Sequence, residues 1–451
     1  MAFVDEIVSS SDAEVVLVDR RDRPGGHWLN AYPFVRLHSP SANYGVNSTP
    51  LGGDRIDVSG PNAGFYERAG ANEICDYFGR VLDENFLASG RVRYLGMTDY
   101  RGADAEGHRL TSLLTGEDTT VTVRRKFVDA TYVESSIPSR HQPSFTVDAD
   151  VRFIAPNDLV DLAEPAAGFT VLGCGKTAMD TCNWLLDAGV DPNTIQWFRP
   201  RDPWLFNRAA MQPLELVGAY VHLQASWVQA AAEAQDAAEF AKRLEADDIL
   251  MRIDPSVEAG AFRGAIISRH ELDGLRSIER VIRDRKVKHI GVKSVRTDKG
   301  DIASDANHVF VDCTAAGVRP TVARPVFEPD RITLQYVTIG NVPWGAATVG
   351  AVEARVADDE AKNQLCPTLT FTGNAADMPT LAYAGMLGLL ARGADPDLSA
   401  WNEASRLNNA RGAAEHLDDP RVADGLSSIV TNIGGAMTNL ERLVKQADSS
   451  R

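Results

Sequence analysis

Apolar and polar positions along the chain follow two spacings, one typical of strands and one typical of helices. Short runs of consecutive apolar residues, bounded by glycine, proline or charged residues, predict buried strands. These runs lie at residues 14–19, 92–96, 126–131, 169–172, 194–198, 288–292, 309–315, 332–337 and 369–374. Apolar positions three or four residues apart predict helices. These segments lie at residues 1–10, 61–83, 177–186, 209–250, 266–282, 381–392 and 426–446.

Local turn and cap residues refine this pattern. Residues 108–114 and 119–125 follow the strand at 92–96 and are separated by turn residues, so they predict a β-meander. Ser268 is expected to cap a helix, with Glu271 three residues on completing a capping box.

A glycine turn joins the strand that ends at Leu172 to the helix that follows it. The turn reads Gly-x-Gly-x-x-Ala, with Gly173, Gly175 and Ala178 at the fixed places and Lys176 and Thr177 opening the helix. The first glycine permits the turn, the second lets a pyrophosphate approach the backbone, and the alanine lets the helix lie close to the strand. We therefore expect a dinucleotide site here; the alternative is a plain strand–turn–helix.

Two arginines follow the next strand. Arg199 stands about where an acid would select NADH, and Arg201 is two residues further on. Arginines at this place suit the additional phosphate of NADPH, because a guanidinium binds phosphate with two parallel hydrogen bonds. The sequence favours NADPH, leaves NADH possible, and leaves open a solvated basic turn.

The first strand ends in an acid, Asp19. In a Rossmann unit this acid binds a ribose and lies about 20 residues after the glycine turn. Counting back places that turn at or before Met1, so the first strand and its glycine loop are missing from this sequence. We expect the codons upstream to encode the loop; the alternative is a chain that has lost it.

The residues after Asp19 resemble a known family. Arg20 opens a charged stretch that leads to Gly25, Gly26, His27 and Trp28, and residues 30–41 follow as Asn-Ala-Tyr-Pro-Phe-Val-Arg-Leu-His-Ser-Pro-Ser. This is similar to the flavin-contacting segment and the Tyr-Pro-Gly-x-Arg stretch of two-dinucleotide-domain flavoproteins, above all flavin-containing and Baeyer-Villiger monooxygenases. The resemblance covers roughly residues 1–200. The sequence departs from the family by Phe34 in place of a glycine and by the absent first glycine loop.

The resemblance implies an α/β fold with two Rossmann-like dinucleotide-binding domains, in which parallel sheets are flanked by helices, with β-meander insertions and a helical insertion. The FAD domain would begin with residues 1–150. The NAD(P)H domain would span 151–320, with the helical insertion at 209–285. Residues 321–451 would return to the FAD domain and close it with helices.

The resemblance also implies FAD, reduced by NADPH and passing electrons to O₂ or to a small organic substrate. The residues expected to hold FAD are Asp19, Arg20, Gly25, Gly26, His27, Trp28, Gly373 and Asn374. Asn47 stands where these monooxygenases carry a polar residue near the flavin, and the resemblance makes it the candidate catalytic residue, whose amide could hydrogen-bond a peroxyflavin. A loop residue bonded to its own backbone is the alternative. Trp28 could equally belong to the core.

Composition limits the other possibilities. A net charge of −16 over 451 residues argues against nucleic acid or an anionic membrane as the main partner. The five cysteines are scattered, without metal spacing or a redox-active pair, and no long apolar run or leader pattern is present. We expect a cytoplasmic protein without a metal. The rival hypothesis is a nucleotide-binding regulator, or a flavin-free enzyme remnant that binds NADPH without catalysis.

Overall fold

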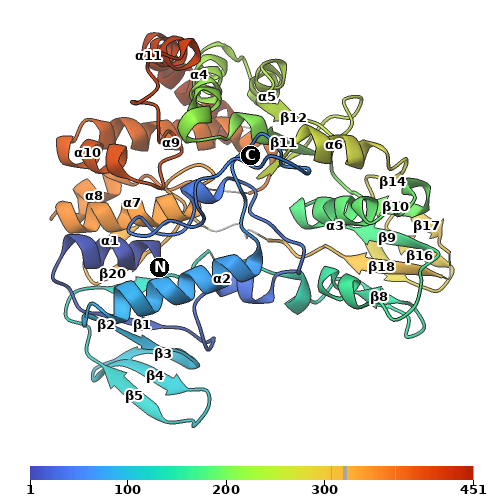
Figure 1. Cartoon of the computed structure of the whole chain (residues 1–451), viewed down its shortest axis with the longest axis horizontal. Coiled ribbons are helices and arrows are strands. Elements are labelled where there is room, and N and C mark those ends of the chain that lie inside the picture. Colours follow the sequence, from blue (N-terminus) through green and yellow to red (C-terminus); the bar gives the residue numbers. More distant parts are fainter. Residues whose placement is uncertain (134, 306, 318–321, 371, 450–451) are drawn as a thin grey trace.

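The computed structural model describes residues 1–133, 135–305, 307–317, 322–370 and 372–449. Its elements form three parts, which Figure 1 shows at the lower left, the right and the top of the view. They are a unit built around the first strands, a unit built on a parallel sheet, and a layer of helices.

The first unit begins with two short strands that pair in parallel. They are β1 (Val15–Val18) and β2 (Val92–Leu95). The helix before β1, α1 (Ala2–Ser10), packs along α7 (Val342–Arg355), which lies far away in the sequence. Their apolar residues bury one another in a shared hydrophobic core, which α2 (Ala71–Arg80) joins through its inner face.

A second small sheet in this unit brings distant segments together. Its strand order is β19 (Phe327–Glu328), β20 (Arg331–Thr333) and β6 (Phe127–Asp129), and β6 and β20 run parallel. The chain thus returns to the first unit after building the second one. A meander is formed by β3 (Thr98–Asp104), β4 (Gly107–Ser112) and β5 (Asp118–Val121), which pair antiparallel. The strand expected at 92–96 is not its first strand, because β2 pairs with β1 and β3, which was not predicted, takes that place.

The second unit contains a five-stranded sheet in the order β14-β10-β9-β18-β8, with all neighbours parallel. Its strands are β8 (Phe153–Ile154), β9 (Gly168–Leu172), β10 (Ile195–Phe198), β14 (Arg280–Ile282) and β18 (His308–Asp312). The three central strands are buried along their whole length, as expected for a parallel sheet covered on both faces. A smaller sheet packs beside it, formed by β7 (Thr146–Val147), β15 (Val287–Ile290), β16 (Ser294–Thr297) and β17 (Gly300–Ala303).

Helices that flank this sheet and the upper layer complete the chain. α3 (Lys176–Asp187) connects β9 to β10, and α6 (Arg269–Arg276) packs on it. In the upper layer α4 (Val217–Glu233) lies along α11 (Pro420–Ser449), with α5 (Ala237–Ala246) and α9 (Met378–Gly393) beside them (Figure 1). The remaining elements are α8 (Asp359–Leu365), α10 (Pro396–Ala404), and the three-stranded sheet of β11 (Pro203–Asn207), β12 (Leu250–Met251) and β13 (Ala261–Ile267).

The structure confirms the predicted α/β class with two Rossmann-like units, β-meander and helical insertion. It differs in detail. The helix expected at 266–282 is three elements, β13, α6 and β14, because Ser268 caps a new helix just after a strand whose last residues are β-branched. The strand expected at 369–374 is reduced to a single bridge at Asn374, and Phe371 within it lies outside the described residues.

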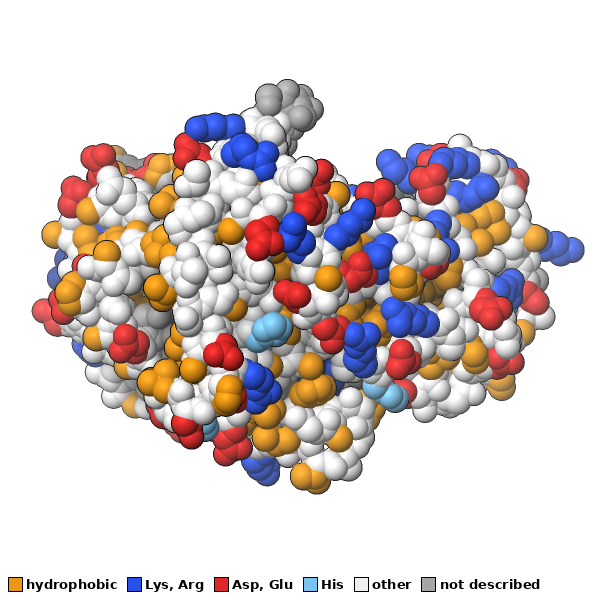
Figure 2. Space-filling view, turned by 90° about the horizontal axis from the view of Figure 1, so that it is seen from above, with side chains coloured by type: hydrophobic (Ala, Val, Ile, Leu, Met, Phe, Trp, Pro, Cys, Tyr) orange, Lys and Arg blue, Asp and Glu red, His pale blue; other side chains and the backbone are white. Residues whose placement is uncertain are grey.

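Charged side chains are spread over the surface. Figure 2 shows acidic and basic side chains interspersed across the face seen from above. The net negative charge is therefore not gathered into one acidic field on this face.

Candidate nucleotide-binding site

The glycine turn after β9 has the geometry that only glycine allows at its first position. Gly173 has a φ of +127°, and a Cβ there would lie 2.4 Å from the carbonyl oxygen of Cys313. The backbone N–H of Gly173 donates to Phe198 O at 2.9 Å, and the indole of Trp197 donates to Gly173 O at 2.8 Å. The turn is therefore fixed between the ends of the three central strands.

The second glycine leaves open space above the start of α3. Gly175 is the N-cap of this helix, and no side chain of a described residue caps it. Apart from its chain neighbours and its own helix backbone, no described atom lies within 4 Å of the place of its missing Cβ. The first-turn N–H groups of Lys176 and Thr177 have no acceptor within the helix, and N–H groups at a helix start can bind an anion. Ala178 is completely buried, which lets α3 lie close on the sheet.

The loop after the Gly25–Gly26 turn lies directly on α3. Tyr32 donates a hydrogen bond from its phenol oxygen to Asp180 Oδ2 at 2.7 Å. Phe34 stacks on Trp184 with ring centroids 4.9 Å apart and planes 19° apart. Two stretches that the sequence analysis treated separately are therefore neighbours across the boundary of the two units.

The end of β1 holds the residues expected near FAD. Asp19 is half-buried, and its Oδ1 accepts the backbone N–H of Arg21 at 2.9 Å. Gly25 and Gly26 both have positive φ, 137° and 57°, and the Cβ position of Gly26 is open. Arg20 instead points to Asp99, with 3.1 Å between Nη1 and Oδ1.

Trp28 and His27 lie side by side after this turn. Their ring centroids are 4.8 Å apart, and the Trp28 indole donates to Tyr44 Oη at 2.7 Å. Trp28 also packs against the core of the first unit, as the alternative hypothesis expected, while His27 is exposed.

Asn47 forms hydrogen bonds through both the nitrogen and the oxygen of its side-chain amide. Its Nδ2 donates to Glu6 on α1, and its Oδ1 accepts from Ser405 Oγ at 2.9 Å and from the backbone N–H of Leu407 at 3.3 Å. In this conformation it joins the first helix to the C-terminal segment.

Gly373 and Asn374 lie beside the three-stranded sheet. Asn374 forms a bridge with Ala261 of β13, and the carbonyl of Gly373 accepts the N–H of Phe262 at 3.0 Å. Gly373 has a φ of +83°. The structure thus places this pair next to β13.

The two arginines after β10 lie in different surroundings. Arg199 is fully buried over the ring of Trp197, 4.6 Å from its centroid, and its Nη2 lies 2.8 Å from Asp202 Oδ1. Burial lowers the pKa of Arg199. Asp202 also accepts from Arg283 Nε at 3.1 Å. Arg201 is exposed, so it is the one of the predicted pair whose side chain reaches solvent.

A charged cluster beneath this site escaped the sequence analysis. We call it the His38 cluster; it consists of His38, Arg68, Lys176, Asp180, Arg208 and Glu271. Lys176 pairs with Asp180 and lies 3.8 Å from Glu271 Oε1, and Arg208 Nη2 lies 2.6 Å from Glu271 Oε2. The Arg208 Nε donates to the carbonyl of His38 at 3.3 Å.

The electrostatics of this cluster follow from its burial and its cations. The nearby charges of Lys176, Arg208 and Arg68 and the N–H of Ser268 outweigh burial and lower the pKa of Glu271 to about 2. Burial, with Lys176 and Arg208 nearby, lowers the pKa of His38 to about 3. Its members come from distant segments, and the one sequence signal was the Ser268–Glu271 capping box, which is present.

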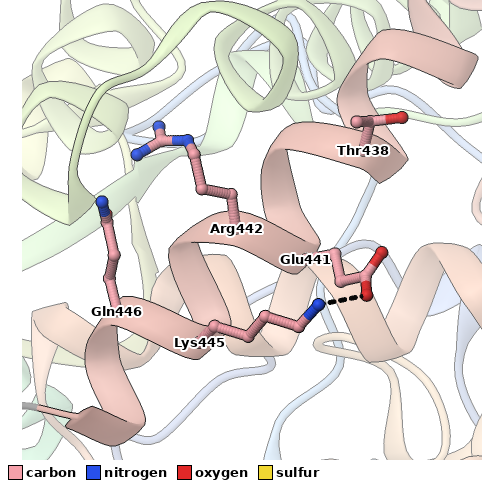
Figure 3. A pocket seen from close by; sticks show the side chains of 5 residues that line it. All are labelled: Thr438, Glu441, Arg442, Lys445 and Gln446. Atoms are coloured by element: carbon pink, nitrogen blue, oxygen red, sulfur yellow. Dashed lines mark hydrogen bonds and ion pairs between the residues drawn. The ribbon is translucent and has the colours of Figure 1, made fainter.

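The hollows on the surface of the described residues include two of similar size. One of ≈ 420 Å³ lies along α11 and is lined by Thr438, Glu441, Arg442, Lys445 and Gln446 (Figure 3). These residues follow one face of a single helix, and we assign the hollow no role. The other, of ≈ 460 Å³, lies between residues 60–65 and the start of α6.

Metal and membrane signals are lacking in the described part of the chain. No group of three or more metal-ligating side chains occurs there. None of the helices described is both long enough and apolar enough to cross a bilayer.

The sequence was compared with protein families, with curated proteins and with solved structures. No protein-family model matches the sequence. The uncharacterized protein Rv2000 of Mycobacterium tuberculosis is 38% identical over 453 residues, covering 100% of this chain and 83% of its own, and Mb2023 of Mycobacterium bovis gives the same values.

Among solved structures, a cyclohexanone monooxygenase mutant from Rhodococcus sp. Phi1 bound to NADP⁺ is similar, with a TM-score of 0.50 and 15% identity. The match covers 87% of this chain and 95% of that one, and it shows the fold. Since the mycobacterial proteins match the whole chain at 38% identity, the chain belongs to the same family as Rv2000 and Mb2023.

Proposed function

We propose that the protein is an NADPH- and FAD-dependent oxidoreductase of the monooxygenase type, acting on a small organic substrate. The observation that carries the proposal is the contact between the two units. The loop that follows Gly25 and Gly26 lies on α3, the helix that opens at the Gly175 turn. Two cofactors bound at these turns would be brought together by this contact.

The residues at the second turn fit a nicotinamide dinucleotide. The open space above Gly175 and the uncapped first turn of α3 suit a pyrophosphate, and Gly173 holds the strand end in place. Lys176 is drawn toward Asp180 and Glu271, so the phosphate donors here are backbone N–H groups.

The coenzyme preference depends on the arginines after β10. Arg199 is occupied by Asp202 and Trp197, so in this conformation Arg201 is the candidate contact for the additional phosphate of NADPH. We keep NADPH as the proposed coenzyme on that basis, with NADH as the alternative.

The residues of the first unit fit two parts of FAD. Asp19 at the end of β1 suits a ribose, and the open Cβ position of Gly26 lets a flat ring approach the backbone. When bound, FAD would accept hydride from NADPH and supply the redox chemistry.

The experiment is to purify the chain, add FAD, remove the excess and record the absorption spectrum, NADPH binding and NADPH oxidation. An absorption band of bound flavin at ~450 nm, together with NADPH oxidation, supports the proposal. A colourless protein that still binds NADPH contradicts it and supports a nucleotide-binding regulator or a flavin-free protein instead.

A further inference from the structure

The two segments that connect the units meet beside the glycine turn. One runs from β6 to β7 and the other follows β18, and they touch where the N–H of Ser136 donates to the carbonyl of Gly317 at 3.0 Å. The second segment begins next to the turn, because the carbonyl oxygen of Cys313 blocks the Cβ position of Gly173. Thr314, the residue after Cys313, therefore lies close to the candidate nucleotide site.

A chain of three polar side chains joins these two segments. Thr314 donates from Oγ1 to Asp312 Oδ1 at 2.6 Å, and His141 Nε2 lies 3.2 Å from Thr314 Oγ1. Asp312 is buried, whereas His141 and Thr314 are half-buried and keep accessible surface. The chain is thus held in the protein at Asp312 and can be reached from outside at His141.

The direction of these hydrogen bonds decides which nitrogen of His141 carries its proton. An ionised carboxylate only accepts, and a hydroxyl has a single hydrogen, so the hydrogen of Thr314 is used by Asp312. His141 Nε2 must then donate to Thr314 Oγ1, which leaves Nδ1 of the neutral imidazole as an acceptor. Among the described residues Nδ1 has no hydrogen-bond partner. The chain therefore offers a ligand one acceptor of fixed identity.

The place of this acceptor in the fold points to the nicotinamide half of the coenzyme. The order of the sheet reverses between β9 and β18, and a dinucleotide lies across the crevice outside the carboxyl ends of the strands at such a reversal. Arg201, the candidate contact for the additional phosphate, follows β10 on one side of β9. The nicotinamide half would then lie on the other side, over the end of β18, where Thr314 is found.

The segment of His141 also contacts the loop proposed for the flavin. Ser139, two residues before His141, donates to the carbonyl of Asn30 at 2.9 Å. Asn157 donates to the carbonyl of Ala31 at 3.1 Å. His141 thus lies between the loop after Gly25 and Gly26 and the end of β18, which is where the two cofactors would have to meet.

We propose that His141 Nδ1 accepts a hydrogen bond from the carboxamide N–H of the nicotinamide, and that Thr314 is the positioning residue that fixes the imidazole for this bond. The carboxamide is the hydrogen-bond donor of the nicotinamide ring, and Nδ1 is an acceptor without a partner in the described protein. The bond would hold the ring in one orientation toward the flavin loop. This inference rests on the proposed function for the identity of the coenzyme.

The test compares two coenzymes on the full chain supplied with FAD, by calorimetry. The probes are NADP⁺ and its acetylpyridine analogue, in which a methyl group replaces the carboxamide NH₂ and the carbonyl remains. We expect NADP⁺ to bind about tenfold more tightly, because the analogue leaves Nδ1 without a donor. Equal binding of the two, or tighter binding of the analogue, overturns the proposal.

Variants assign the preference for NADP⁺ to the two residues. His141→Phe should weaken NADP⁺ by about tenfold, to the affinity of the analogue, and leave the analogue itself nearly unchanged. Thr314→Val should lower the preference, because Nε2 no longer has to carry the proton, and Thr314→Ser should restore it. A purely structural role would weaken both coenzymes equally, and that result, or an unchanged preference in His141→Phe, overturns the assignment.

A second histidine–threonine pair supplies the matched control. His289 Nδ1 lies 2.8 Å from Thr146 Oγ1 in the smaller sheet, and the His289 side chain is 30% exposed. His289→Phe should therefore keep the parent preference for NADP⁺. Should His141→Phe not fold, the comparison of the two coenzymes on the parent protein decides the matter.

This inference and the proposed function fail separately. Equal binding of the two coenzymes by a protein that holds flavin and oxidises NADPH removes only the contact from His141. A protein that prefers NADP⁺ as expected but holds no flavin removes only the proposed oxidoreductase activity. Binding of neither coenzyme overturns both.

Discussion

Tyr32 donates a hydrogen bond to Asp180 across 148 positions of sequence, with 2.7 Å between Oη and Oδ2. Burial, together with the negative charge of Asp180, raises the pKa of Tyr32, so the phenol remains the donor. This bond ties the loop of the first unit to α3 of the second, next to the glycine turn. Breaking it tests whether the two units depend on each other.

The first prediction concerns this bond. Tyr32→Phe keeps the ring and removes the donor, and a hydrogen bond to a charged group contributes about 1.5–3 kcal/mol. We expect a loss of this size in urea denaturation, and a coupling of about 1–2 kcal/mol with Asp180→Asn in a double-mutant cycle. Tyr94→Phe is the control, because the Tyr94 hydroxyl is buried and no described residue is its partner. Additive effects would contradict the coupling.

The second prediction concerns the nucleotide turn. Gly175 has an ordinary φ of −86° and open space at its Cβ position, so the fold can accept a side chain there. Gly175→Asp should abolish NADPH binding, because a carboxylate would repel the pyrophosphate, whereas Gly175→Ala should weaken binding only modestly. Fluorescence titration with NADPH measures both. Unchanged affinity in the aspartate variant, with an unchanged circular dichroism spectrum, would remove this turn as the binding site.

The turn and the central strands could be predicted from sequence because their signals are local. A glycine at Gly173 and apolar residues through Leu172 are sufficient to indicate a strand, a turn and a helix. The helix α7 was missed, since its apolar residues surround it almost evenly and so give no amphipathic pattern. The segment at 266–282 has the apolar spacing of a helix, although the β-branched residues at both of its ends favour strands.

Some residues of the candidate site could be named from the sequence alone, and others could not. Gly175 and Asp19 could be named from their place in a motif. The His38 cluster could not, because Arg68, Arg208 and Glu271 meet only after the chain has folded. The burial of Arg199 was equally hidden, since the sequence gives Asp202 three residues away but not whether the pair faces solvent.

The third prediction concerns how the C-terminal segment holds the loop before α2. The Arg406 guanidinium donates to the carbonyl oxygens of Ala42 at 2.6 Å, Tyr44 at 2.5 Å and Val46 at 2.7 Å. Arg406→Met leaves these three acceptors without this donor, so we expect a loss of about 2–4 kcal/mol in urea denaturation.

A control variant separates this effect from the loss of any surface charge. Arg421 is 61% exposed and pairs with Asp419 at 2.8 Å. Exposed pairs contribute about 0–1 kcal/mol, so Arg421→Met should change stability little. Equal losses of stability in Arg406→Met and Arg421→Met would show that the three hydrogen bonds to carbonyl oxygens add no stability beyond that of a surface charge.

The last prediction concerns pH. The pKa of His38 is about 3 in the folded protein against an ordinary value of 6.5, because burial and the cations Lys176 and Arg208 oppose its protonation. Between these values the unfolded chain binds a proton at His38 that the folded protein does not, so stability is fully present above pH 6.5 and falls as the pH decreases toward 3. The slope from this residue is at most about 1.4 kcal/mol per pH unit. Glu271 adds its own loss only below its ordinary pKa of 4.5.

Urea denaturation at pH 7, 6 and 5 therefore measures the contribution of His38 to the pH dependence of stability before Glu271 contributes. The variant His38→Gln should lose stability less steeply over this range than the parent protein, by up to about 2 kcal/mol at pH 5. The bond from Arg208 to the backbone carbonyl of residue 38 remains available in the variant, since it does not involve the imidazole. His222 on α4 is exposed, so His222→Gln should keep the parent slope. If His38→Gln also keeps it, then His38 protonates as readily in the folded protein as in the unfolded chain, and the cluster does not exclude a further positive charge.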